Sequence, residues 1–288
     1  GTKGMHYMAS EAIYDYAQAH DDHLLLQERM RHPIAFHAEM MGDIMHLHQA
    51  LKQPDALQFI KAVIREINGH IKNDHWQLIR KDEVPKGHKV TPSVWAMRCK
   101  CKLITNEIKS HKAQLNLHGG KQVYGVNYFE TYAPVVAWSS VRLFLVLSLT
   151  LGWQTCSIDF SSAFVQASLT DPVWIHMPRG FKSDQPSDQR TCLRLVKSLY
   201  GLSVAPRLWY QHIREALLLQ GLKQSATDSC LLYSKTIMIV LYVDDLGIAY
   251  SNKKDLDKLF QDLTDLGLEF TREGTFTDFL GIKFVKDE

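Results

Sequence analysis

An almost wholly apolar run that ends in two adjacent aspartates constrains the fold more than any other feature of this 288-residue sequence. The run, residues 236–243, is rich in β-branched side chains and leads directly into Asp244 and Asp245. Such a run predicts a strand that is buried on both faces. Two carboxylates at the end of a buried strand are costly unless a positive charge neutralises them, and divalent metal ions commonly do so. A hairpin turn, where Asp is common for local hydrogen-bonding reasons, is the alternative, and for an isolated pair it is the better interpretation.

A second acidic strand end favours the metal-binding interpretation. Residues 154–160 predict a short strand that ends in Asp159-Phe160. Three carboxylates from two strand ends are what a two-metal phosphoryl-transfer site requires, because one ion activates the attacking oxygen and the other steadies the leaving group. We expect Asp159 and Asp244 to bridge the two ions and Asp245 to assist.

The distribution of charge agrees with this hypothesis, although the net charge of +2 indicates no class of partner. Residues 80–121 hold ten basic and three acidic side chains, whereas residues 244–288 hold six basic and eleven acidic ones. A cationic stretch and an anionic stretch suit a protein that grips a polyanion in one place and holds metal cations in another. Two solvated faces of opposite sign are the alternative.

The five cysteines are an odd number without a Cys-x-x-Cys pair, so neither a disulfide framework nor a cysteine zinc site is indicated, and we expect an intracellular, reduced protein. The longest mostly apolar run, residues 143–153, is far short of the ~20 residues that a spanning helix needs. We expect no signal peptide, and because the sequence begins with Gly and ends in a charged tail, we expect it to be a segment of a longer protein.

Residues 1–50 are rich in histidine and methionine. They suggest a zinc site at His20, His23, His46 and His48, but scattered polar helix positions are the favoured interpretation, because no cysteine or His-Glu-x-x-His pattern accompanies them.

The hydrophobic periodicity predicts an α+β sandwich with helices on one face of an antiparallel sheet. Helices are expected at residues 55–72, 141–151, 207–220 and 256–266, the second of them buried. Strands are expected at residues 94–101, 154–160, 236–243, 246–250 and 279–285.

Tyr-x-Asp-Asp after an apolar strand resembles the signature of reverse transcriptases, and the resemblance to the copia-like retrotransposon enzymes covers about residues 33–288. The matching blocks, in chain order, are Lys112-Ala113, Gln122, 125–128, 130–136, Arg142, 159–164, 177–181, 199–202, 205–207, Trp209-Tyr210 and 279–282.

The resemblance implies the fingers and palm of a right-hand polymerase, with the palm a ferredoxin-like βαββαβ sheet. The implied division is an N-terminal extension, mostly helical or irregular, at 1–54, an N-terminal helix and basic fingers at 55–134, palm at 135–170, a fingers insertion at 171–197 and palm with the Tyr-Val-Asp-Asp hairpin at 198–288.

The resemblance also implies roles for individual residues. Asp159, Asp244 and Asp245 would be catalytic, and with Phe160 they would bind two Mg²⁺ or Mn²⁺ ions. Phe164 matches the aromatic steric gate that excludes a 2′-hydroxyl, with plain core packing as the alternative. Triphosphate binding is implied for Arg98, Lys100 and Lys112. Nucleic-acid binding is implied for Tyr242, Arg142 and Arg207, with a surface salt bridge as the alternative for the two arginines.

Three departures from the family pattern weaken the expected nucleotide site. Gln114 stands where an Arg is usual, and Ser203-Val204 where Lys-Gln is usual, while Ala167 replaces a Gly. A triphosphate-binding cation and an amide near the nucleotide are therefore expected to be missing, unless His111 or Lys109 substitutes.

The function expected from the resemblance is an RNA-directed DNA polymerase acting on an RNA template, a DNA primer and deoxynucleoside triphosphates. It would belong to a polyprotein whose integrase and RNase H lie outside this chain, in a cytoplasmic virus-like particle or the nucleus, with no membrane partner. The alternatives are an eroded nucleic-acid-binding relic and a metal-dependent phosphohydrolase.

Overall fold

Two units alternate along the chain. The computed structural model describes residues 5–7, 44–101, 108–122, 130–183, 191–276, 278–279 and 282–284. The first unit comprises Gly1–Tyr128 and Leu169–Ser203, and the second comprises Phe129–Ser168 and Val204–Glu288. Each unit has mixed helix and strand content with mainly antiparallel sheets.

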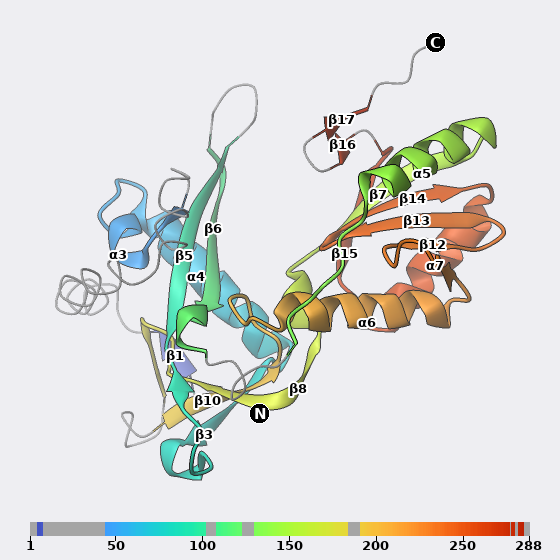
Figure 1. Ribbon diagram of the computed structural model, residues 1–288. Helices are drawn as coiled ribbons and strands as arrows, with labels where there is room; N and C mark the ends of the chain where they lie inside the picture. Colours follow the sequence, from blue (N-terminus) through green and yellow to red (C-terminus); the bar gives the residue numbers. More distant parts are fainter. Residues whose placement is uncertain are drawn as a thin grey trace. The chain divides into compact units, whose positions relative to one another are not determined.

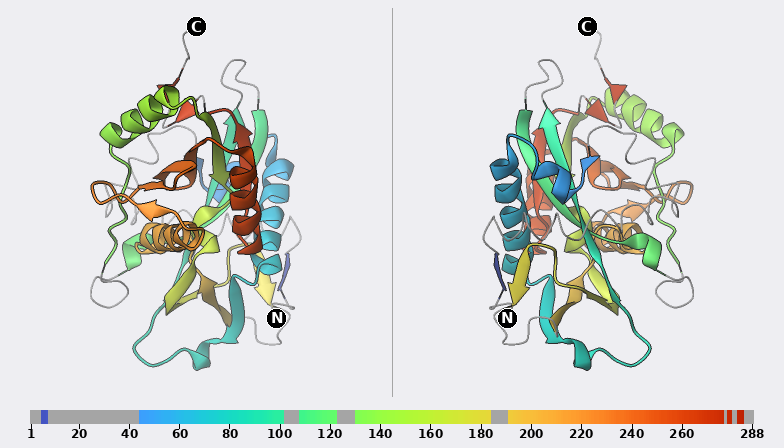
Figure 2. Two further views of the ribbon diagram at one scale, coloured as in Figure 1. Left: turned by 90° about the vertical axis from the view of Figure 1, so that its right-hand side faces the viewer. Right: turned by 90° about the vertical axis from the view of Figure 1, so that its left-hand side faces the viewer.

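A helix-covered sheet forms one part of the first unit. The strands β2 (Ile44–Met45), β5 (Ser93–Cys101) and β6 (Ile108–Leu117) pair in the order β2-β5-β6, and the short helix α3 (Leu47–Ala50) contacts β5. Helix α4 (Ala56–Lys72), which confirms the helix predicted at 55–72, lies alongside β6 (Figure 2). The core between them contains Phe59, Val63, Ile67, Met97 and Leu115.

The rest of the first unit is built from short strands. A four-stranded sheet has the order β3 (Trp76–Arg80), β10 (Thr191–Lys197), β8 (Ser168–Ile175), β4 (Val90–Thr91), in which β4 and β8 run parallel. The strands β1 (Met5–Tyr7) and β9 (Phe181–Ser183) pair antiparallel. Single 3-10 turns occur at η1 (Lys81–Glu83) and η2 (Gly119–Lys121).

The second unit is organised around a six-stranded sheet. Its order is β11 (Lys223–Gln224), β12 (Leu231–Tyr233), β13 (Ile237–Tyr242), β14 (Asp245–Tyr250), β7 (Gln154–Phe160), β15 (Phe270–Gly274), and every neighbouring pair is antiparallel. The predicted strands at 154–160, 236–243 and 246–250 are confirmed, and residues 237–241 are all buried, as a strand covered on both faces should be.

Helices cover both faces of this sheet, so the expectation that helices lie on one face is wrong (Figure 1). Helices α6 (Ala205–Leu219) and α7 (Lys253–Asp265) cover the face that carries Phe160 and Phe270, through Trp209 and Phe260 respectively. Helix α5 (Trp138–Thr150) covers the opposite face, because its Phe144 packs on Phe276 and that ring lies over Gly247.

Two further predictions are corrected. Helix α5 is not buried all round, because Leu143, Val146 and Leu149 are exposed. Of the predicted strand at 279–285, the described residues 279 and 282–284 do not join the sheet; the short strands β16 (Asp278–Phe279) and β17 (Ile282–Lys283) pair with each other. The sheet instead ends at β15. None of the described helices combines the length and hydrophobicity that are needed to cross a membrane.

Candidate active site

The Tyr242–Asp245 segment forms the tight turn between β13 and β14. Tyr242 and Asp245 are cross-strand partners, so Val243 and Asp244 are the two central residues of the hairpin. Val243 has a φ of 52°, in the left-handed region that β-branched residues rarely adopt. Such a conformation costs about 1–3 kcal/mol and persists only where the surrounding structure holds it.

Trp209 of α6 is hydrogen-bonded to this turn. Its Nε1 donates a 2.6 Å hydrogen bond to the carbonyl oxygen of Val243. The indole is buried and also packs edge-on against Phe160, with ring centroids 4.9 Å apart. The main-chain N–H of Phe160 in turn donates to the carbonyl oxygen of Asp244, at 2.9 Å. One buried side chain therefore contacts a residue adjacent to Asp159 and a residue adjacent to Asp244.

The three predicted carboxylates lie together at this end of the sheet. Asp159 on β7 is directly opposite Asp245 on β14, and Asp244 immediately precedes Asp245 in the turn. Directly opposed residues of an antiparallel pair point to the same face, with Cβ atoms about 4.5–5.5 Å apart. Burial raises the pKa of Asp245 to about 6, and the neighbouring carboxylates of Asp244, Asp159 and Glu273 add to the increase. Two aspartates on adjacent strands and a third in the turn thus repel one another when charged.

This arrangement fits a divalent cation. A cation bound among carboxylates that raise one another's pKa removes the repulsion, and carboxylate oxygens are the ligands that Mg²⁺ and Mn²⁺ prefer. The ring of Phe160 packs on Trp209 and Phe270. Because a Phe side chain has no ligand atom, Phe160 could contribute only its main-chain carbonyl oxygen. Among the described residues, only the group of Asp55, Cys99 and His111 has its ligand atoms within 4.8 Å of one another. Asp159, Asp244 and Asp245 could hold a cation once their side chains turn toward it, with Phe160 able to contribute one main-chain oxygen.

Phe164 lies in the 3-10 turn η3 (Ala163–Gln166) that follows β7. The turn is entered through Ser162, whose φ is 53°. Gln166 fastens it to the start of β15: its Nε2 donates to the carbonyls of Ser161 and Glu269, at 2.8 and 2.9 Å, and its Oε1 accepts from the N–H of Glu269. Phe164 is half-buried between the buried Ala163 and Val165, so it is only partly a core residue.

The predicted triphosphate ligands lie on the β5–β6 hairpin of the first unit. Arg98 and Lys112 are cross-strand partners, and Gln114 follows two residues after Lys112 on the same face. Lys100 belongs to the same strand as Arg98, paired through its main chain with Ser110. Arg98, Lys112 and Gln114 therefore share the face of the hairpin that is opposite the one that packs on α4. His111 points to the α4 face, which places it away from them.

The predicted nucleic-acid ligands are scattered over the second unit. Arg142 is exposed on α5, whereas Arg207 forms an ion pair with Glu130 at 2.5 Å, the alternative considered for it. Tyr242 packs edge-on against Phe279, and Val204 is the residue that precedes α6.

Of the histidines considered for zinc, His20 and His23 lie outside the described residues, while the rings of His46 and His48 stack 5.8 Å apart.

The contacts of Trp209 and Gln166 and the effect of Glu273 on the pKa of Asp245 were not predicted from the sequence. A buried indole N–H must find an acceptor, which marks Trp209 as noteworthy, but its acceptor is a main-chain carbonyl and has no sequence signal. The same holds for Gln166, whose partners are all main-chain groups.

Comparison with known proteins identifies a family and several relatives of this chain. The profile of the family described as "Reverse transcriptase (RNA-dependent DNA polymerase)" matches residues 73–288. The chain is similar to the retrovirus-related Pol polyprotein from transposon TNT 1-94 of Nicotiana tabacum, with 29% identity over 250 residues, covering 84% of this chain and 18% of the relative. Two Arabidopsis thaliana relatives are the Pol polyproteins from transposons RE2 (33% identity, 70% of this chain, 14% of the relative) and RE1 (34%, 69% and 13%). The chain spans less than a fifth of the length of these three relatives.

Proposed function

Because the chain belongs to the reverse transcriptase (RNA-dependent DNA polymerase) family, we propose that it is the polymerase segment of a copia-like retrotransposon polyprotein. It extends a DNA primer on an RNA template: the primer 3′-hydroxyl attacks the α-phosphorus of a deoxynucleoside triphosphate, and pyrophosphate leaves. The observation that carries the proposal is the pairing of Asp159 with Asp245 beside Asp244.

The aspartates have distinct proposed roles. Asp159 and Asp244 would hold the divalent cations, Asp245 would assist, and Phe160 would add its main-chain carbonyl. Two Mg²⁺ or Mn²⁺ ions, when bound, supply activation of the 3′-hydroxyl and stabilisation of the charge on the leaving pyrophosphate. The raised pKa of Asp245 supports this assignment, because three clustered carboxylates favour a cation among them.

The second unit serves as the palm and the first as the fingers in this proposal. The order β13-β14-β7-β15, with α6 and α7 as the connecting helices, supports a ferredoxin-like βαββαβ palm. We assign 135–170 and 198–288 to the palm, 55–134 and 171–197 to the fingers, and 1–54 to an N-terminal extension, with bounds that differ by a few residues from those of the two units.

Substrate contacts follow from the same assignment. Arg98, Lys100 and Lys112 bind the triphosphate, Gln114 and Val204 contribute to nucleotide binding only weakly, and Phe164 excludes the ribose 2′-hydroxyl. Arg142, Arg207 and Tyr242 contact the template or primer. Integrase and RNase H belong to other parts of the polyprotein, and the particle of such an element is the proposed location.

Extension of a labelled DNA primer on an RNA template, with Mg²⁺ or Mn²⁺, tests the function. We expect template-directed addition of deoxynucleotides with one pyrophosphate released for each. Duplex binding without extension would identify a relic, and phosphate release without extension would identify a phosphohydrolase; either result contradicts the proposal.

A further inference from the structure

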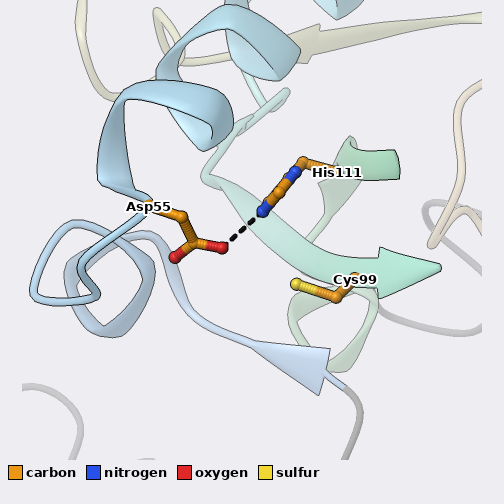
Figure 3. Close-up of side chains that lie close together, drawn as sticks. All are labelled: Asp55, Cys99 and His111. Carbon is orange, nitrogen blue, oxygen red and sulfur yellow. Dashed lines mark hydrogen bonds and ion pairs between the residues drawn. The ribbon is translucent and has the colours of Figure 1, made fainter. Parts of the chain in front are cut away.

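Asp55, Cys99 and His111 form a group in the first unit that the polymerase chemistry does not use (Figure 3). Their ligand atoms, a carboxylate oxygen, the Cys99 sulfur and a ring nitrogen, all lie within 4.8 Å of one another. All three side chains are half-buried. We propose that this group binds one Zn²⁺ ion, independently of the catalytic cations.

The backbone places these side chains together. Cys99 on β5 and His111 on β6 are directly opposed cross-strand partners on the face that packs against α4. Asp55 immediately precedes α4, and its carboxylate makes no capping hydrogen bond to that helix. It contacts Nε2 of His111 instead, as the dashed line in Figure 3 marks. A cross-strand pair and a helix start thus converge on one point.

The donor set suits zinc in particular. Zn²⁺ prefers thiolate, imidazole and carboxylate ligands at about 2.0–2.3 Å, and a tetrahedral site of that size separates its ligand atoms by about 3.3–3.7 Å. The three ligand atoms, which all lie within 4.8 Å of one another, are close to this spacing. Mg²⁺ and Ca²⁺ prefer all-oxygen ligands, so a site with sulfur and nitrogen discriminates against the proposed catalytic ions. Three protein ligands leave the fourth position for water.

Neighbouring groups orient the histidine. Phe59 of α4 packs edge-on against the His111 ring, with centroids 4.7 Å apart, and Arg65 donates to the His111 main-chain carbonyl at 3.3 Å. The ring is therefore held with Nε2 toward Asp55. Bound metal would join the start of α4 to the hairpin whose other face carries Arg98 and Lys112. Zinc would thereby stabilise the first unit.

Cobalt titration of the full chain, metal-free and reduced, tests the site, because Co²⁺ substitutes for Zn²⁺ and absorbs by charge transfer only when a thiolate is its ligand. We expect one equivalent of Co²⁺ to produce this absorption and one equivalent of Zn²⁺ to abolish it. Zn²⁺ should also raise the melting temperature of the wild type.

Single variants identify the ligands. Cys99→Ser should abolish the charge-transfer absorption, and Asp55→Asn and His111→Gln should each weaken Co²⁺ binding at least tenfold. Cys156→Ser, which removes a half-buried strand cysteine of the second unit, should bind as the wild type does. The proposal is overturned if the wild type shows no such absorption, if it survives Cys99→Ser, or if Asp55→Asn and His111→Gln bind Co²⁺ as tightly as the wild type. Circular dichroism of each variant establishes that it is folded, and none of these readouts depends on polymerase activity.

Discussion

The indole N–H of Trp209 donates a 2.6 Å hydrogen bond to the carbonyl of Val243, the central turn residue with a φ of 52°. The bond joins α6 to the turn that carries Asp244, and the same indole packs on Phe160, which follows Asp159. The positions of the two proposed metal-bridging aspartates therefore depend on one buried side chain. Trp209 is a positioning residue in this account, because it acts through its neighbours.

Trp209→Phe should lower the rate of primer extension about tenfold while changing template affinity little. Phe retains most of the ring packing but loses a hydrogen bond, worth about 0.5–1.5 kcal/mol, that holds a strained turn. A change of 1.4 kcal/mol in the barrier corresponds to about tenfold in rate. Steady-state extension at varied Mg²⁺ should also show a weaker apparent Mg²⁺ affinity.

Trp76→Phe is the matched control for this change. Trp76 is as buried as Trp209, but its Nε1 makes no hydrogen bond within the described residues. We expect Trp76→Phe to leave the Mg²⁺ dependence of extension unchanged. An equal shift of the Mg²⁺ dependence in both variants would mean that Trp209 acts only through general stability.

Phe164→Val should allow ribonucleotides to be incorporated more readily, with a modest loss of deoxynucleotide use. The change removes ring bulk from the η3 turn while Gln166 still fastens that turn to β15. We expect discrimination between the two sugars, measured as the ratio of kcat/KM values, to fall about tenfold or more. An unchanged ratio would identify Phe164 as a packing residue only.

Asp245→Asn should stabilise the metal-free protein at pH 7, raising its melting temperature by a few degrees. The pKa of Asp245 is raised from 3.8 to about 6, so protonation favours the folded state; this contribution is complete below about pH 4 and is lost as the pH rises through 6. The advantage of Asn should therefore shrink as the pH falls from 7 to 4. A stability difference that does not vary over this range would contradict the proposed cluster, and saturating Mg²⁺ should reverse the order at pH 7.

Gln114→Arg combined with Val204→Gln should lower the apparent Michaelis constant for deoxynucleotides at least tenfold. Gln114 shares a strand face with Arg98 and Lys112, where a guanidinium would add charge-assisted contacts worth about 1.5–3 kcal/mol. The salt dependence of template binding should barely change, because those phosphates are held elsewhere. The wild type should accordingly be slow at low nucleotide concentration. Tight nucleotide binding by the wild type, or an unchanged Michaelis constant in the double variant, would show that other residues bind the triphosphate.

Sequence periodicity was sufficient to predict the bounds of the helices and strands that are buried on one face or on both. The bounds of β7 match the prediction, and β13 and α4 differ from it by one or two residues, because their apolar patterns are set by core packing. Strand β15 was not predicted. It is an edge strand whose residues 271–274 are exposed, and its sequence therefore shows no alternation of apolar and polar residues. Helix α5 was expected to be buried because it is almost wholly apolar, but only one side of it meets the sheet.

The candidate site was predictable where chemistry is carried by side chains that must sit at strand ends. Asp159, Asp244 and Asp245 were selected on that ground, and they do lie together. The bonds of Trp209 and Gln166 to main-chain carbonyls depend on tertiary placement, which a single sequence does not encode locally. The group of Asp55, Cys99 and His111 likewise depends on cross-strand register, which the sequence alone left open.

The central claim is that the clustered aspartates catalyse nucleotidyl transfer, and comparing Asp159→Asn and Asp244→Asn with Asp265→Asn in primer extension on an RNA template tests it most directly. Each Asn keeps the side-chain shape and removes one negative charge; Asp265 is exposed at the end of α7, so its variant controls for the charge alone. We predict that the first two variants lose extension to a trace while folding and binding the template as the wild type does, and that Asp265→Asn extends normally. More than a trace of extension by Asp159→Asn or Asp244→Asn would contradict the account.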